Sequence, residues 1–110
     1  MGIVKSYPVK KIVAGKEVQT SDSIVCYSNY YKTNGESAIV INSKTECTLV
    51  LDETTTDHVT IKAMSDVKVV TDKLIDDKFE EILLEKYSSV ELRYIVNSWY
   101  IMSSDGIKNS

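Results

Sequence analysis

Short apolar stretches with alternating polarity recur through the middle of the chain, and polar turns separate them. In each stretch the apolar residues occupy every second position, which is the period of a strand with one face in a core. None of these stretches has helical spacing. The pattern predicts an all-β fold with these core positions: Ile39, Ile41, Cys47, Leu49, Leu51, Val59, Ile61, Ala63, Val67 and Val69.

The run from Tyr87 to Ser104 predicts a β-hairpin, because two apolar-rich stretches flank the pair Asn97-Ser98. Pairing Val96 with Trp99 across this break places one set of side chains on a common face. That face should close the core and holds Val90, Leu92, Tyr94, Val96, Trp99 and Ile101.

The opposite face of this hairpin is too apolar to face water alone. It holds Glu91, Arg93, Ile95, Tyr100 and Met102. We therefore expect Ile95, Tyr100 and Met102 to pack against a neighbouring subunit. An N-terminal strand of the same chain is the alternative cover.

The regular spacing of short strands between polar turns predicts one antiparallel β-sandwich or jelly-roll-like domain of about eight or nine strands. Residues 16–104 are expected to form this domain. Residues 1–15, interrupted by Pro8, are expected to be an arm or edge strand, and residues 105–110 a loose tail.

Charge and hydropathy disfavour two classes of partner. The 110 residues carry 13 basic and 16 acidic side chains, interspersed, for a net charge of −3, so no positive field attracts a phosphate backbone. No apolar run approaches the length that crosses a bilayer, and no leader segment is expected. We expect no nucleic-acid or membrane partner.

The residues that could carry chemistry do not combine into a catalytic site. The acidic segments 52–57 and 72–77 lack the spacing of a calcium loop and are expected to be solvated turns. His58 is the one histidine, and strand alternation directs it away from Asp57. Cys26 and Cys47 each lie in an expected strand and are expected to be buried free thiols. The sequence predicts no enzyme, no metal site and no cofactor.

A polar loop carries two adjacent aromatic residues, Tyr30 and Tyr31. Paired rings of this kind can stack on a sugar or on a partner protein. The alternative is that both rings fold down over the end of the domain.

Several short motifs together resemble the small β-domains of bacteriophage virion proteins, such as tail fibres, tailspikes and head fibres. The matching residues are Asp22, Leu51-Asp52, Val59-Thr60-Ile61-Lys62, Ile75-Asp76, Tyr87, Val90 and Trp99-Tyr100-Ile101. The resemblance covers residues 18 to 104. It departs from the pattern before the tryptophan, where the family places a glycine-containing turn and this chain has Asn97-Ser98, and the chain lacks a repetitive shaft.

The resemblance implies a homotrimeric, non-enzymatic virion structural protein, made in the host cytoplasm. It would serve as a capsid decoration, a head fibre or a tail component and would bind other virion proteins or a host-surface glycan. Head and tail locations stay open. The alternative function is a carbohydrate-binding or host-adhesin module that uses Tyr30, Tyr31 or Tyr100 as a stacking platform.

Overall fold

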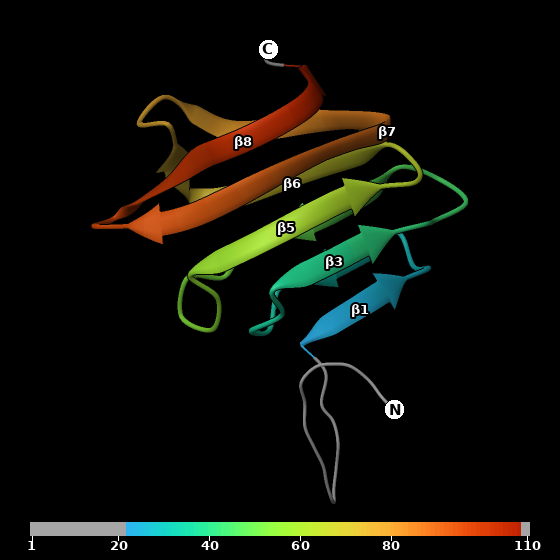
Figure 1. Ribbon diagram of the computed structural model, residues 1–110, viewed down its shortest axis with the longest axis horizontal. Coiled ribbons are helices and arrows are strands. Elements are labelled where there is room, and N and C mark those ends of the chain that lie inside the picture. Colours follow the sequence, from blue (N-terminus) through green and yellow to red (C-terminus); the bar gives the residue numbers. More distant parts are fainter. Residues whose placement is uncertain (1–21, 109–110) are drawn as a thin grey trace, which may run out of the picture.

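The computed structural model describes residues 22–108, and over this range the chain forms eight strands and no helix (Figure 1). The strands are β1 (Ser23–Cys26), β2 (Tyr30–Lys32), β3 (Ala38–Ile41), β4 (Cys47–Val50), β5 (His58–Ala63), β6 (Val67–Ile75), β7 (Phe79–Ile95) and β8 (Ser98–Lys108). They form a single compact domain, so the prediction of an all-β domain is confirmed. The expected N-terminal arm, residues 1–15, lies outside the described residues.

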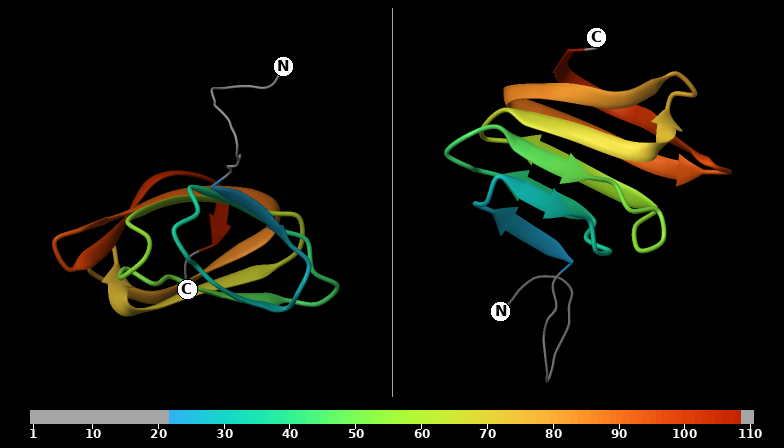
Figure 2. Two further views of the ribbon diagram at one scale, coloured as in Figure 1. Left: turned by 90° about the horizontal axis from the view of Figure 1, so that it is seen from below. Right: turned by 180° about the vertical axis from the view of Figure 1, so that it is seen from behind.

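The first six strands alternate between two layers. β1, β3 and β5 pair in parallel to form one layer, and β2, β4 and β6 pair in parallel to form the other. Two consecutive strands therefore make one coil, and three coils stack in a solenoid-like arrangement (Figure 2).

The predicted antiparallel sandwich or jelly roll is therefore wrong. A strand with one buried face has the same period of two whether its neighbours run parallel or antiparallel. The pattern of apolar residues consequently identified the strands without identifying how they pair. The turns between consecutive strands from β1 to β6 lead to the opposite layer, and not to an adjacent antiparallel strand.

The core lies between the two layers, and equivalent positions of successive coils stack on one another. Ile39 is in register with Ile24 on one side and Ile61 on the other, and Ile61 is in register with Val90. All ten core positions expected from the alternating stretches are buried. At roughly 25 cal/mol per Å² of apolar area, this aligned burial is the main favourable term in folding.

β7 closes the last coil by pairing with both layers. Its first half runs antiparallel to β6 and its second half antiparallel to β5. The strand changes partner at residues 85–88, where Tyr87 has a φ of 78°. β8 then pairs antiparallel with β7 (Figure 1). At the opposite end, β1 and β2 each have one neighbouring strand among residues 22–108.

The chain remains a strand beyond residue 104, where a loose tail was expected. Ile107 pairs with Leu84, and Lys108 pairs with Leu83. Gly106 allows the chain to pair with β7 again, because its φ is 82° and a Cβ atom there would lie 2.8 Å from the Cβ of Ser88. β8 therefore pairs with both halves of the long strand β7.

Candidate functional site

The hairpin of β7 and β8 turns at Val96 and Asn97, one residue earlier than predicted. Tyr94 pairs with Trp99, and Ile95 pairs with Ser98. The φ angles of Val96 and Asn97 are 42° and 72°, which is the left-handed pair that a type I′ turn requires. Asparagine tolerates this conformation, whereas valine, branched at Cβ, is an outlier there.

The inner face of the hairpin matches the prediction except at Val96. Val90, Leu92 and Trp99 are buried, and Tyr94 and Ile101 pack against the core. The rings of Tyr94 and Trp99 lie 5.3 Å apart at an angle of 54°. The indole N–H of Trp99 has no acceptor within the described residues, so packing alone holds this ring. Val96 lies at the tip of the hairpin and is 85% exposed.

The outer face presents the three residues expected at an interface. Ile95, Tyr100 and Met102 all lie on it, and Ile95 and Met102 are 43% and 53% exposed. Tyr100 is half-buried, and its hydroxyl donates to a carboxylate oxygen of Asp77 at 3.1 Å. This hydrogen bond raises the pKa of Tyr100. The structure thus brings the three residues together, and their role as an interface stays a prediction.

Leu74 of β6 extends this apolar surface, which the sequence analysis missed. It pairs with Ser98, which pairs with Ile95 on its other side, so the three side chains share one face. Ser98 is buried between its larger neighbours, while Leu74 is 40% exposed. We call Leu74, Ile95, Val96, Tyr100 and Met102 the hairpin patch. In the sequence, the adjacent apolar residues Leu74 and Ile75 were the signal that this strand end has apolar side chains on both of its faces.

Charged and polar side chains lie beside the hairpin patch on the same face. Glu91 accepts a hydrogen bond from His58 Nε2 at 2.7 Å and another from the hydroxyl of Ser103 at 3.2 Å. The bond from His58 first, and that from Ser103 second, lower the pKa of Glu91. Arg93 pairs with Tyr100 across the two strands. This arrangement gives the apolar patch a polar rim.

The group of His58, Glu91 and Ser103 is not a catalytic triad. In a triad the histidine lies between the nucleophile and the acid, so that it can take the proton of the nucleophile. Here the carboxylate lies between, and the hydroxyl of Ser103 donates to Glu91. Asp57 does not meet His58 through its side chain, as expected; its carbonyl oxygen accepts a hydrogen bond from the backbone of Tyr94.

Tyr30 and Tyr31, the candidate stacking residues, point to opposite faces of β2. Tyr30 is exposed on the outer face, whereas Tyr31 packs against the core. The hydroxyl of Tyr31 donates to Glu36. Burial first, and this contact second, raise the pKa of Tyr31 to about 12. The two rings therefore do not form one platform, and Tyr30 alone presents an open ring.

The acidic segment 52–57 forms a turn, as expected, whereas residues 72–75 of the second segment lie in β6 and only Asp76 and Asp77 lie in a turn. Asp52 accepts hydrogen bonds from the hydroxyl and the backbone N–H of Thr54 at 2.6 and 3.0 Å; the first, and then the second, lower the pKa of Asp52. Asp76 and Asp77 both have positive φ in the turn after β6, and Asp76 accepts from the backbone of Ile101. Within residues 22–108, no group of three or more His, Cys, Asp or Glu side chains could hold a metal ion.

Cys26 and Cys47 are free and buried, as expected. They are close enough in the core that Cys26 affects the ionisation of Cys47. Burial first, and Cys26 second, raise the pKa of Cys47 to about 11. A thiol with a raised pKa is a poor nucleophile at neutral pH, so Cys47 acts as a small apolar core residue.

No family model matches this sequence, and no curated protein matches it significantly. In the described part of the chain, no helix is long and apolar enough to cross a membrane.

Proposed function

We propose that this protein is a non-enzymatic structural component of a bacteriophage virion, a homotrimer that acts by binding its own copies and other virion proteins. The hairpin patch is the observation that carries this proposal. It gathers exposed apolar side chains from three adjacent strands around the end of the hairpin. Contiguous exposed apolar area of this kind is typical of protein interfaces.

The strained residue at the tip of the hairpin supports the same proposal. Val96 combines a positive φ with 85% exposure, so neither its backbone conformation nor its burial accounts for a valine at this position. Strained residues collect at functional surfaces, where a contact made by the side chain offsets the strain. A valine at the tip is explained if it inserts into an apolar site on a neighbouring subunit.

The layout around the patch also fits an interface. A stable contact buries about 800 Å² per partner, with an apolar centre and a polar rim. The hairpin patch would supply the centre. Glu91, Arg93 and His58 would supply part of the rim, where hydrogen bonds fix orientation. The resemblance to phage virion domains accounts for the choice of a trimer and of a virion location, on either the head or the tail.

Native mass spectrometry of the purified protein tests this proposal. We expect a trimer at micromolar concentration, and we expect Tyr100→Glu to dissociate it, because a charge would then be buried at the contact. Tyr30→Glu is the matched control, since it replaces an exposed tyrosine near the opposite end of the solenoid and should leave the trimer intact. A strictly monomeric wild-type protein would refute the proposal. A trimer unaffected by Tyr100→Glu would refute the placement of the interface.

A further inference from the structure

One lateral edge of the solenoid is built from turns that stack on one another. Hydrogen bonds join them in sequence: Asn42 N to Cys26 O at 2.8 Å, Met64 N to Ile41 O at 2.7 Å, and Cys47 N to Asp66 O at 3.0 Å. The backbone N–H of Lys86 then donates to Asp66 Oδ1 at 3.0 Å. We call segments 27–29, 42–46, 64–66 and 85–88 the turn edge.

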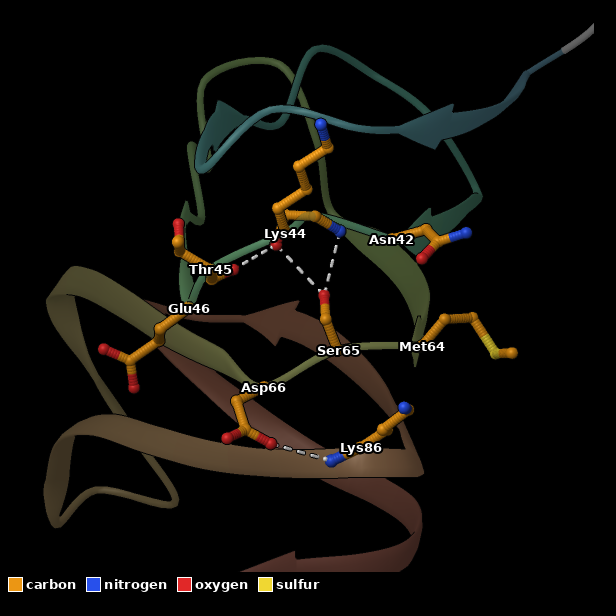
Figure 3. A pocket seen from close by; sticks show the side chains of 9 residues that line it. Asn42, Lys44, Thr45, Glu46, Met64, Ser65, Asp66 and Lys86 are labelled. Atoms are coloured by element: carbon orange, nitrogen blue, oxygen red, sulfur yellow. Dashed lines mark hydrogen bonds between the residues drawn. The ribbon is translucent and has the colours of Figure 1, made fainter.

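The turn edge contains an open pocket of about 310 Å³ (Figure 3). This volume is at the lower end of the range for small-molecule sites. Polar side chains from three turns line it, among them Asn42, Lys44, Glu46, Ser65, Asp66 and Lys86.

Hydrogen bonds fix the floor of the pocket. The hydroxyl of Ser65 accepts from the backbone N–H of Ser43 at 2.9 Å and lies 3.0 Å from the hydroxyl of Ser43. Ser43 is itself buried. The two turns are therefore held together before any ligand arrives, which lowers the entropic cost of binding.

The lining chemistry indicates the class of ligand. Lys44 and Lys86 are matched by Glu46 and Asp66, so the pocket has no excess of charge that would select a simple anion or cation. Met64 offers the one apolar side chain of the lining, too little for a hydrocarbon ligand. Interspersed donors and acceptors suit a neutral molecule that carries many hydroxyl groups.

Exposed tyrosines lie at both ends of the turn edge. Tyr87 adjoins the pocket, because the Nζ atom of Lys86 is 5.2 Å from the centre of its ring. Its positive φ of 78° is a second strained position on the surface. Tyr27 lies in the turn of the first coil, next to the turn that contains Asn42. Three strand spacings separate the turn that contains Tyr27 from the turn that contains Tyr87, or about 14 Å at 4.8 Å per strand.

We propose that the turn edge binds a short neutral saccharide chain. One sugar ring occupies the pocket, where its hydroxyls bond to Asn42 and Lys86, and a neighbouring sugar stacks on Tyr87. Sugars combine an apolar C–H face with a polar rim, and this complements exposed aromatic rings beside polar side chains. The site differs from the Tyr30 and Tyr31 pair and lies apart from the hairpin patch. The saccharide proposal can therefore be tested independently of subunit assembly.

The test is a titration of the ¹⁵N-labelled full chain with maltotriose, cellotriose and chitotriose, followed by amide chemical shifts. We expect saturable shifts for at least one of the three sugars, confined to residues 27–29, 42–46, 64–66 and 85–88. Tyr87→Ala and Asn42→Ala should each weaken the affinity about tenfold, because each removes one contact. Tyr30→Ala is the matched control and should leave the affinity unchanged.

Three results would overturn the inference. The first is an absence of shifts with all three sugars up to their solubility limits. The second is a response of the same amides to inorganic phosphate or sulfate alone, which would make the pocket an anion site. The third is loss of sugar binding in Tyr30→Ala with retention in Tyr87→Ala, which would move the platform to β2. Unchanged amide shifts of residues 92–101, in the hairpin away from the turn edge, establish that each variant is folded.

Discussion

The hydroxyl of Ser98 donates a hydrogen bond to the carbonyl oxygen of Leu74 at 3.0 Å, at the point where β8 begins and β6 approaches its end. The two residues are also partners in a short parallel ladder. This contact fastens the terminal hairpin to the last coil of the solenoid. Leu74 and Ile95 therefore lie on either side of Ser98, and this arrangement creates the hairpin patch.

Enlarging Ser98 should therefore destabilise the fold. Ser98→Val adds volume where the side chain is buried and removes the bond to Leu74, so the free energy of unfolding should fall by about 1–3 kcal/mol. Urea denaturation measures this change. Ser103→Val, an exposed position on the same strand, is the control and should have a smaller effect. Equal effects of the two substitutions would show that the contact with Leu74 contributes little.

The raised pKa of Cys47 predicts a protected thiol. At pH 8 a thiol with a pKa of about 11 is almost entirely protonated, and Cys47 is also fully buried. Iodoacetamide should modify Cys47 very slowly in the native protein and rapidly in concentrated urea, with peptide mass spectrometry as the readout. Fast labelling under native conditions would mean that the second coil opens readily.

The lowered pKa of Glu91 predicts a stabilisation that depends on pH. The carboxylate is favoured in the folded state by hydrogen bonds from His58 and Ser103, so its folded pKa lies below its unfolded value of about 4.3. The contribution is therefore present above that unfolded value and is lost as the pH falls through the folded pKa. The difference in urea midpoint between wild type and Glu91→Gln should be seen at pH 7 and vanish in acid.

His58 provides an internal check on this assignment. His58→Gln removes the first cause of the lowered pKa, so the carboxyl group of Glu91 should titrate closer to its ordinary value. Carbon-detected NMR of the glutamate side chains follows this titration directly. An unchanged pKa of Glu91 in His58→Gln would show that the pair does not persist in solution.

The core could be predicted from the sequence because alternation reports burial independently of topology. Residues such as Ile61 and Leu49 lie on the buried apolar face of their strand in either a sandwich or a solenoid. The pairing direction could not be predicted, since the short turn 42–46 leads equally well to an adjacent strand or to the opposite layer. Nothing in the period of the strands separates these two outcomes.

The outer face of the hairpin was predicted despite an error in the turn. The expected partner of Tyr94 was Ile101, and the observed partner is Trp99, two residues away. A displacement of two residues preserves which side chains share a face, whereas a displacement of one would have reversed it. Ile95, Tyr100 and Met102 were therefore grouped correctly. Leu74 was missed because its neighbour is set by the tertiary pairing of β6 with β8.

Val96 should show a conflict between stability and assembly. A left-handed conformation costs a residue with a Cβ about 1–2 kcal/mol, and asparagine tolerates it far better than valine. Val96→Asn should therefore raise the free energy of unfolding by about 1 kcal/mol, measured by urea denaturation at a dilution where the protein is monomeric. The same substitution should weaken the trimer in native mass spectrometry, because it removes the most exposed apolar side chain of the hairpin patch. Val25→Asn, at an exposed valine in β1 without positive φ, is the control and should not increase stability. A stabilised variant that assembles as well as wild type would show that Val96 makes no contact between subunits.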